Sequence, residues 1–91
     1  MQIAFTNAAR TDIAKYFYGN KYKDFYAYLK LLSLGGTEGF SRNNNVKRYE
    51  YSNEGLWVVR FRNYRIFCTI SAKFNAEDIL LIHKVIDRSD S

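Results

Sequence analysis

Residues 57–68 read WVVRFRNYRIFC, and this stretch determines the predicted fold. Two runs rich in aromatic and β-branched residues flank Arg62-Asn63. That pattern predicts two antiparallel strands joined by a two-residue turn, in which Arg60 faces Arg65. Because side chains alternate along a strand, a slip of one residue would move each of them to the other face. The register therefore specifies which side chains form the core.

In this register the hairpin has one apolar face and one charged face. The charged face carries Arg60 opposite Arg65, and like charges paired across strands repel each other. We therefore expect an anion between these two arginines. Alternatively, they belong to a solvated face on which Glu50 pairs with one of them, and a three-residue turn would move Arg65 to the core side. The apolar face is expected to pack against helices and comprises Trp57, Val59, Phe61, Tyr64, Ile66 and Cys68.

The rest of the chain predicts an α+β fold with the element order β-α-α-β-β-β-β. Two N-terminal helices, or one bent helix, are expected on one face of a mainly antiparallel sheet of four to five strands. Thr6 or Asn7 caps the first helix, which ends at Gly19-Asn20. The second helix starts near Tyr22 and ends at Gly35-Gly36. The expected strands are residues 2–6, 46–51, 56–62, 64–71 and 78–86.

Three connecting segments complete this prediction. Residues 35–45 hold three of the five glycines and a run of asparagines, which is typical of a mobile loop. Residues 52–55 form a turn, and residues 72–77 form a looser one. A chain of 91 residues has room for one domain, which we expect to span residues 1–91.

Composition excludes several classes of protein. The longest aliphatic run, residues 79–82, is far shorter than the roughly 20 apolar residues of a membrane helix. Arg10 and Asp12 interrupt any signal-peptide core, so we expect a cytoplasmic protein that makes no membrane contact. One Cys and one His cannot form a Cys/His zinc cage, so no metal and no cofactor are expected. Cys68 is expected to be a buried apolar residue.

Positive charge is concentrated in residues 42–65. This span holds six basic and two acidic residues, a surplus of four out of a net charge of +5. A basic domain of this kind suits an anionic partner such as nucleic acid. Guanidinium groups bind phosphate oxygens in a planar, bidentate manner. Phe67 and Tyr49 are candidates for stacking on the bases of a single strand.

His83 is the only histidine and lies in the most apolar predicted strand. A lone histidine in such a strand is a hydrogen-bonded structural residue or a general base that works near neutral pH. Both interpretations remain open at the level of the sequence.

The second half of the chain resembles the RelE/ParE superfamily of toxins from bacterial type II toxin–antitoxin systems. The similarity spans about residues 45–89 and is nearest to the HigB-like branch, in which an apolar-apolar-His step in a strand precedes a basic tail. The matching runs are Val46-Lys47-Arg48-Tyr49, Gly55-Leu56-Trp57-Val58-Val59-Arg60-Phe61, Tyr64-Arg65-Ile66-Phe67 and Ile79-Leu80-Leu81-Ile82-His83-Lys84.

The resemblance implies a RelE-like fold and a toxin that an antitoxin partner covers on its basic face. Many members cleave mRNA in the ribosome, where the substrate's 2′-hydroxyl attacks the adjacent phosphate. The resemblance matches Arg65 to an arginine that stabilises the phosphate and Lys84 to a basic position near the C-terminus. Together with His83, the only imidazole, they are the candidate catalytic residues. The candidate RNA-binding residues are Lys47, Arg48, Arg60, Arg62, Phe67 and Arg88.

Several members place a Tyr or His near the C-terminus as an acid or base, and residues 86–91 contain neither. This leaves His83 or a lysine to move the proton, or else catalysis is weak or absent. The expected function is therefore a ribosome-dependent mRNA endonuclease. The alternatives are a non-enzymatic DNA gyrase inhibitor of the ParE type and a basic RNA- or partner-binding module.

Overall fold

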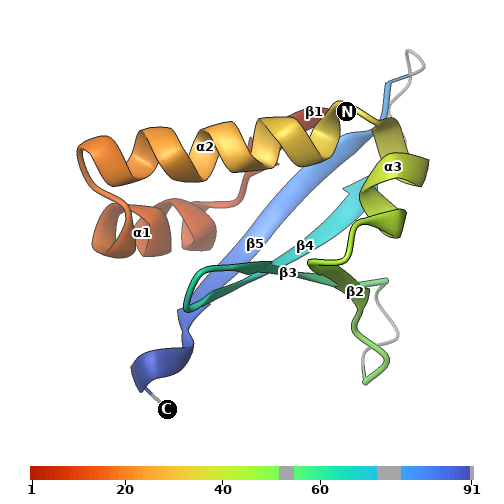
Figure 1. Cartoon of the computed structure of the whole chain (residues 1–91). Coiled ribbons are helices and arrows are strands. Elements are labelled where there is room, and N and C mark those ends of the chain that lie inside the picture. The colour runs from red at the N-terminus through yellow and green to blue at the C-terminus, as the bar shows by residue number, and fades with distance from the viewer. Residues whose placement is uncertain (52–54, 72–76, 91) are drawn as a thin grey trace.

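The computed structural model describes residues 1–51, 55–71 and 77–90, which form a small α+β domain with a five-stranded mixed sheet. Figure 1 shows helices α1 and α2 together on one side of this sheet and α3 beside its far end. The expected α+β class is confirmed. The elements are β1 (Gln2–Phe5), α1 (Asn7–Tyr16), α2 (Asn20–Ser33), α3 (Gly36–Arg42), β2 (Val46–Arg48), β3 (Trp57–Phe61), β4 (Tyr64–Ser71), β5 (Ile79–Asp87) and the 3₁₀ turn η1 (Arg88–Asp90).

The strands lie in the order β1-β5-β4-β3-β2. Strand β1 is parallel to β5, and the other neighbours are antiparallel. The central hairpin has the predicted register, because Phe61 pairs with Tyr64 and Arg60 pairs with Arg65. Arg62 adopts φ 55 at the turn, a left-handed conformation that costs an L-residue roughly 1–2 kcal/mol.

The core lies between the sheet and helices α1 and α2. Val59, Ile66 and Cys68 are fully buried, as the hairpin pattern predicts. Phe17 and Phe25, one from each side of the α1–α2 turn, stack with their ring centroids 4.2 Å apart. Aromatic packing of this kind supplies much of the burial available to a domain this small.

The prediction of a mobile loop over residues 35–45 is wrong for α3. Phe40 is fully buried and packs edge-on against Trp57, with the ring centroids 5.9 Å apart. This burial outweighs the poor helix propensity of glycine. A Cβ atom at Gly35 would lie 3.0 Å from the Gly39 Cα, which is tighter than most real contacts, so this close approach favours glycine.

Several predicted boundaries also differ from the structure. Strand β2 ends at Arg48 rather than at residue 51, and β5 runs to Asp87 rather than to residue 86. The expected turns at 52–55 and 72–77 lie for the most part outside the described residues. Within the described ranges, no helix has both the length and the apolar character to cross a membrane.

The pairing of β4 with β5 contains a bulge that the sequence pattern does not show. Phe67 pairs with Lys84, but the next residue, Cys68, pairs with Ile82, so His83 has no partner across the ladder. An extra residue of this kind interrupts the alternation of side chains. Ile82 and Val85 are therefore both buried, and the two residues between them share the opposite face.

Burial raises the pKa of the Cys68 thiol to about 12. We expect iodoacetamide at pH 8 to label Cys68 at least ~100-fold more slowly in the folded protein than in urea, because the thiolate is the reactive form. Mass spectrometry against time measures both rates. Labelling at similar rates would show that this side of the sheet is not the core.

Candidate anion and nucleic-acid interface

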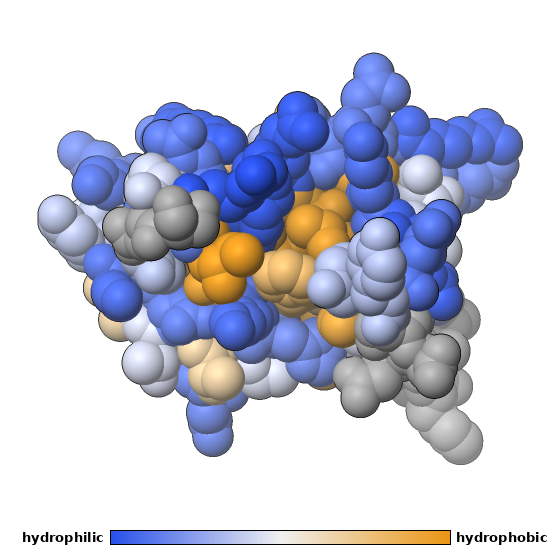
Figure 2. Space-filling view, turned by 90° about the horizontal axis from the view of Figure 1, so that it is seen from below, coloured by the Kyte–Doolittle hydropathy of each residue, from blue (hydrophilic) through white to orange (hydrophobic). Residues whose placement is uncertain are grey.

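The sheet face opposite α1 and α2 is open, and it carries most of the candidate site residues. Figure 2 shows this face as apolar hollows between hydrophilic side chains. The residues that line the two hollows come from β2 to β5 and from the segments that flank them. They are Asn44, Asn45, Lys47, Arg48, Tyr49, Val58, Arg60, Arg65 and Phe67 in the first, and Tyr49, Leu56, Phe67, His83, Lys84 and Ile86 in the second.

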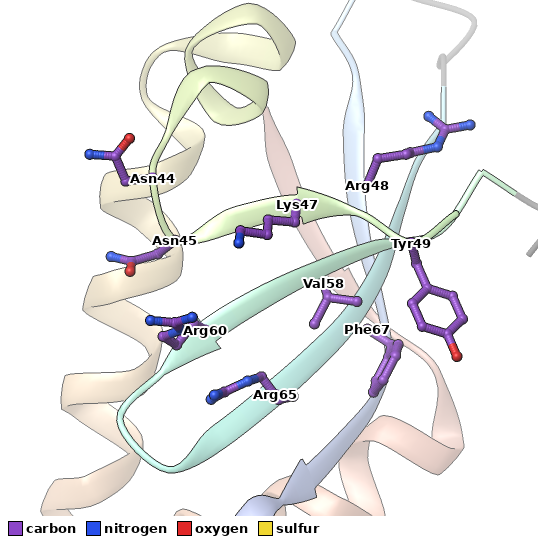
Figure 3. Close-up of a pocket in the computed structure, with 9 residues that line it drawn as sticks. All are labelled: Asn44, Asn45, Lys47, Arg48, Tyr49, Val58, Arg60, Arg65 and Phe67. Carbon is purple, nitrogen blue, oxygen red and sulfur yellow. The ribbon is translucent and has the colours of Figure 1, made fainter. Parts of the chain in front are cut away.

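The first hollow is basic and has a volume of about 310 Å³. Lys47, Arg60 and Arg65 lie to one side of Val58, and Tyr49 and Phe67 lie to the other (Figure 3). Alternation along β2, β3 and β4 places these side chains on one face. A hollow of this size and charge can hold a phosphate group together with part of a nucleoside.

Arg60 and Arg65 are directly opposed across β3 and β4. Partial desolvation lowers the pKa of Arg65, and the positive charges of Arg88 and Arg60 lower it further. In the described ranges, neither Arg60 nor Arg65 forms an ion pair with a carboxylate, and Glu50 is not paired with them. The two like charges are therefore left uncompensated by the protein in this part of the chain.

The backbone of Arg60 is held from two sides. Its N–H donates to the carbonyl oxygen of Asn45 at 2.7 Å, and its carbonyl oxygen accepts a hydrogen bond from the Tyr28 hydroxyl at 3.0 Å. Burial raises the pKa of Tyr28, against the opposing effect of the Asn45 side chain. Tyr28 therefore remains a donor at neutral pH, and α2 helps to fix the strand that carries Arg60.

An aromatic ridge separates the first hollow from the second. Tyr49 and Phe67 meet edge to face, with ring centroids 5.7 Å apart and planes at 88°. Both rings line both hollows. Tyr49 is exposed and Phe67 is half-buried. A ridge of this kind offers nucleobases a surface on which to stack, which contributes about 1–3 kcal/mol per base in single-stranded sites.

The second hollow contains His83 and Lys84, which the bulge brings to this face. His83 is half-buried, and its Nε2 lies 2.8 Å from Oγ1 of Thr69, so these two side chains share a hydrogen bond. Lys84 is exposed and lies opposite Phe67. The histidine is therefore hydrogen-bonded, as in the structural interpretation, and also lines the open hollow.

Three predicted RNA-binding residues lie apart from these hollows or at their margin. Arg48 alternates to the opposite side of β2, where its guanidinium carbon is 5.2 Å from the Trp57 ring centroid, and Figure 3 shows it directed away from Lys47. Arg62 lies at the hairpin turn, 3.3 Å from Asp24. Arg88 is near enough to Arg65 to lower its pKa, and its backbone N–H donates to Asn63.

Sequence reasoning missed several residues of this face. Val58 could have been found, because it alternates with Arg60 in the predicted strand. Thr69 could have been found in the same way, because it alternates with Arg65 and Phe67 in β4. Ile86 depends on the bulge in β5, and Asn44 and Asn45 depend on the turn after α3. In the part of the chain that the structure describes, no group of three or more His, Cys, Asp or Glu side chains is placed to bind a metal ion.

Comparison of the chain with protein families, with curated proteins and with solved structures found no match.

We expect sulfate to stabilise the folded protein, because a bound dianion would relieve the repulsion between Arg60 and Arg65. For a dissociation constant near 10 mM, 50 mM sulfate contributes about 1 kcal/mol. That contribution raises the melting temperature by about 4–8 °C relative to chloride at equal ionic strength. Thermal unfolding of the wild type and of Arg65→Gln measures the difference.

The matched control is Arg10→Gln, which removes one positive charge from α1. It should keep the full response to sulfate, and Arg65→Gln should lose most of it. An equal response in all three proteins would mean that sulfate acts through general salt effects.

Proposed function

We propose that the open sheet face binds single-stranded RNA and that the protein is an mRNA endonuclease, the toxin of a type II toxin–antitoxin system that acts on the ribosome. The observation that carries this proposal is the clustering of Lys47, Arg60 and Arg65 beside the Tyr49–Phe67 ridge. The resemblance of residues 45–89 to RelE/ParE toxins supports the choice of substrate. The cognate antitoxin that this resemblance implies would cover the same basic face.

Charge and stacking together favour a single strand over a duplex. Phosphate oxygens of the backbone fit the guanidinium groups of Arg60 and Arg65. Bases can reach the faces of Phe67 and Tyr49 only when they are not paired and stacked in a helix. A flexible mRNA segment meets both conditions.

The proposed reaction is attack of a ribose 2′-hydroxyl on the adjacent phosphate. The bond between the 2′-oxygen and phosphorus forms, and the bond between phosphorus and the 5′-oxygen breaks. The products are a 2′,3′-cyclic phosphate and a 5′-hydroxyl. The protein has to orient the strand, stabilise charge on the phosphorane and move two protons.

The positions of the side chains suggest a division of these roles. Arg65 and Phe67 are two residues apart on one face, which corresponds to about 7 Å along the strand, and Lys84 lies opposite Phe67. The positive charges of Arg65 and Lys84 would both stabilise the negative charge of a phosphate that lies between them. His83 takes the proton of the 2′-hydroxyl, and Lys84 gives a proton to the leaving 5′-oxygen.

The contact with Thr69 fixes which tautomer of His83 this mechanism needs. Nε2 is engaged with the threonine hydroxyl, so Nδ1 is the nitrogen left for the substrate. For Nδ1 to accept a proton, Nε2–H must donate to Oγ1 of Thr69. Thr69 thereby orients the ring of the proposed base.

The test is cleavage of mRNA on translating ribosomes by the purified protein, mapped by primer extension. We expect cuts within A-site codons, a loss of about 10²–10³-fold in rate for Arg65→Ala and a comparable loss for His83→Ala. Arg10→Ala, which removes a positive charge from the helical side, is the matched control and should cleave at the wild-type rate.

Two other outcomes of these experiments would favour a different function. Intact mRNA together with DNA-damage signalling on expression would indicate a gyrase inhibitor. Intact mRNA with unhindered growth, while soluble protein accumulates, would leave a module that binds RNA or a partner without catalysis. A folded Arg65→Ala variant that still cleaves would remove Arg65 from the mechanism.

A further inference from the structure

The edge of β5 that faces away from β4 pairs with β1 before the bulge and with side chains near or in α1 after it. Strand β1 pairs with β5 only as far as Phe5 and Ile82, and the Thr6 N–H donates to the Ile82 carbonyl oxygen at 3.0 Å. Beyond that point β1 has ended, and the backbone of residues 83–85 would present unpaired polar groups on this edge. Buried or half-buried backbone groups need a hydrogen-bond partner.

The N-cap Thr6 and Asp12, in the middle of α1, supply the missing partners. The Thr6 hydroxyl, which also caps α1, donates to the carbonyl oxygen of His83 at 3.2 Å. The Asp12 carboxylate accepts a hydrogen bond from the Val85 N–H at 2.9 Å. These two contacts, at the His83 carbonyl oxygen and the Val85 N–H, flank Lys84. His83 and Lys84 are the two residues that the bulge places on the open face.

The bulge determines whether the Lys84 side chain lies on the open face or on the core face of the sheet. In a regular strand that continued from Ile82, His83 would pair with Phe67, and Lys84 would pair with Ile66 on the core side. Val85 would then move to the open face. The bulge reverses this order, so that the observed pairs are Lys84 with Phe67 and Val85 with Ile66.

We propose that Asp12 is a positioning residue that holds the β5 bulge and so keeps His83 and Lys84 together on the open face. A carboxylate hydrogen-bonded to a backbone N–H is a strong, directional contact. It fixes Val85 in the bulged register while that side chain packs in the core. The catalytic part of this inference rests on the proposed endonuclease function, whereas the positioning itself does not.

Three variants of α1 separate positioning from general stability. Asp12→Ala removes the acceptor, and Asp12→Asn keeps an acceptor oxygen. Thr11→Ala changes a neighbour whose hydroxyl donates within α1, to the Asn7 carbonyl oxygen. The structural readouts are amide hydrogen exchange at Val85 and NMR proximity between the His83 ring and the Thr69 methyl group.

We expect the Val85 amide to exchange at least tenfold faster in Asp12→Ala and the contact between His83 and Thr69 to be lost. Asp12→Asn and Thr11→Ala should match the wild type in both readouts. In the mRNA cleavage assay, kcat should fall at least tenfold for Asp12→Ala with KM within twofold, and Asp12→Asn should recover it.

An Asp12→Ala variant that keeps both NMR readouts would overturn the proposal, even if its overall stability dropped. If this variant does not fold, scalar coupling across the hydrogen bond between the Val85 amide and the Asp12 carboxyl carbon can be measured in the wild type. Absence of this coupling would also overturn the proposal. Absence of mRNA cleavage by the wild type would reject the proposed function alone, because the NMR readouts test the bulge without any substrate.

Discussion

The pairing of β3 with β4 in a single register is the constraint on which the rest of the molecule depends. It sends Val59, Ile66 and Cys68 into the core and leaves Arg60 beside Arg65 on the opposite face. The apolar half of the hairpin holds this register, because a one-residue slip would expose the core residues. Burial on one face therefore enforces a repulsive charge pair on the other, and an anion such as a backbone phosphate would relieve that repulsion.

The bulge in β5 brings two consecutive side chains to the open face, which a regular strand cannot do. Alternation allows one side chain in two to reach a given face, yet His83 and Lys84 are consecutive and lie on the same face. Helix α1 supports this irregularity through Thr6 and Asp12, which take over as partners where β1 ends. The basic hollow and the His83–Lys84 hollow thus meet at the shared Tyr49–Phe67 ridge, as a strand of RNA crossing the sheet would require.

The sequence predicts the parts of this arrangement that follow local rules. Period-two patterning and a two-residue turn gave the hairpin register, the hairpin's core face and the opposed arginines. The sequence pattern could not predict α3, because the burial of Phe40 outweighs the low helix propensity of this glycine-rich segment. Nor could it predict the bulge, whose hydrogen-bond partners Thr6 and Asp12 lie more than 70 residues earlier in the chain. Alternation places Arg48 on the opposite side of β2, at the margin of the first hollow, and the hairpin turn places Arg62 near Asp24.

Amide chemical shifts can map where the protein binds RNA. A short single-stranded RNA with 2′-O-methyl sugars, which cannot be cleaved by 2′-hydroxyl attack, is titrated into ¹⁵N-labelled protein. We predict that the largest shift changes fall on the open face, at Lys47, Arg60, Arg65, Phe67 and Lys84, and that α1 and α2 change little. Changes centred on the helices, or none at saturating RNA, would contradict this prediction.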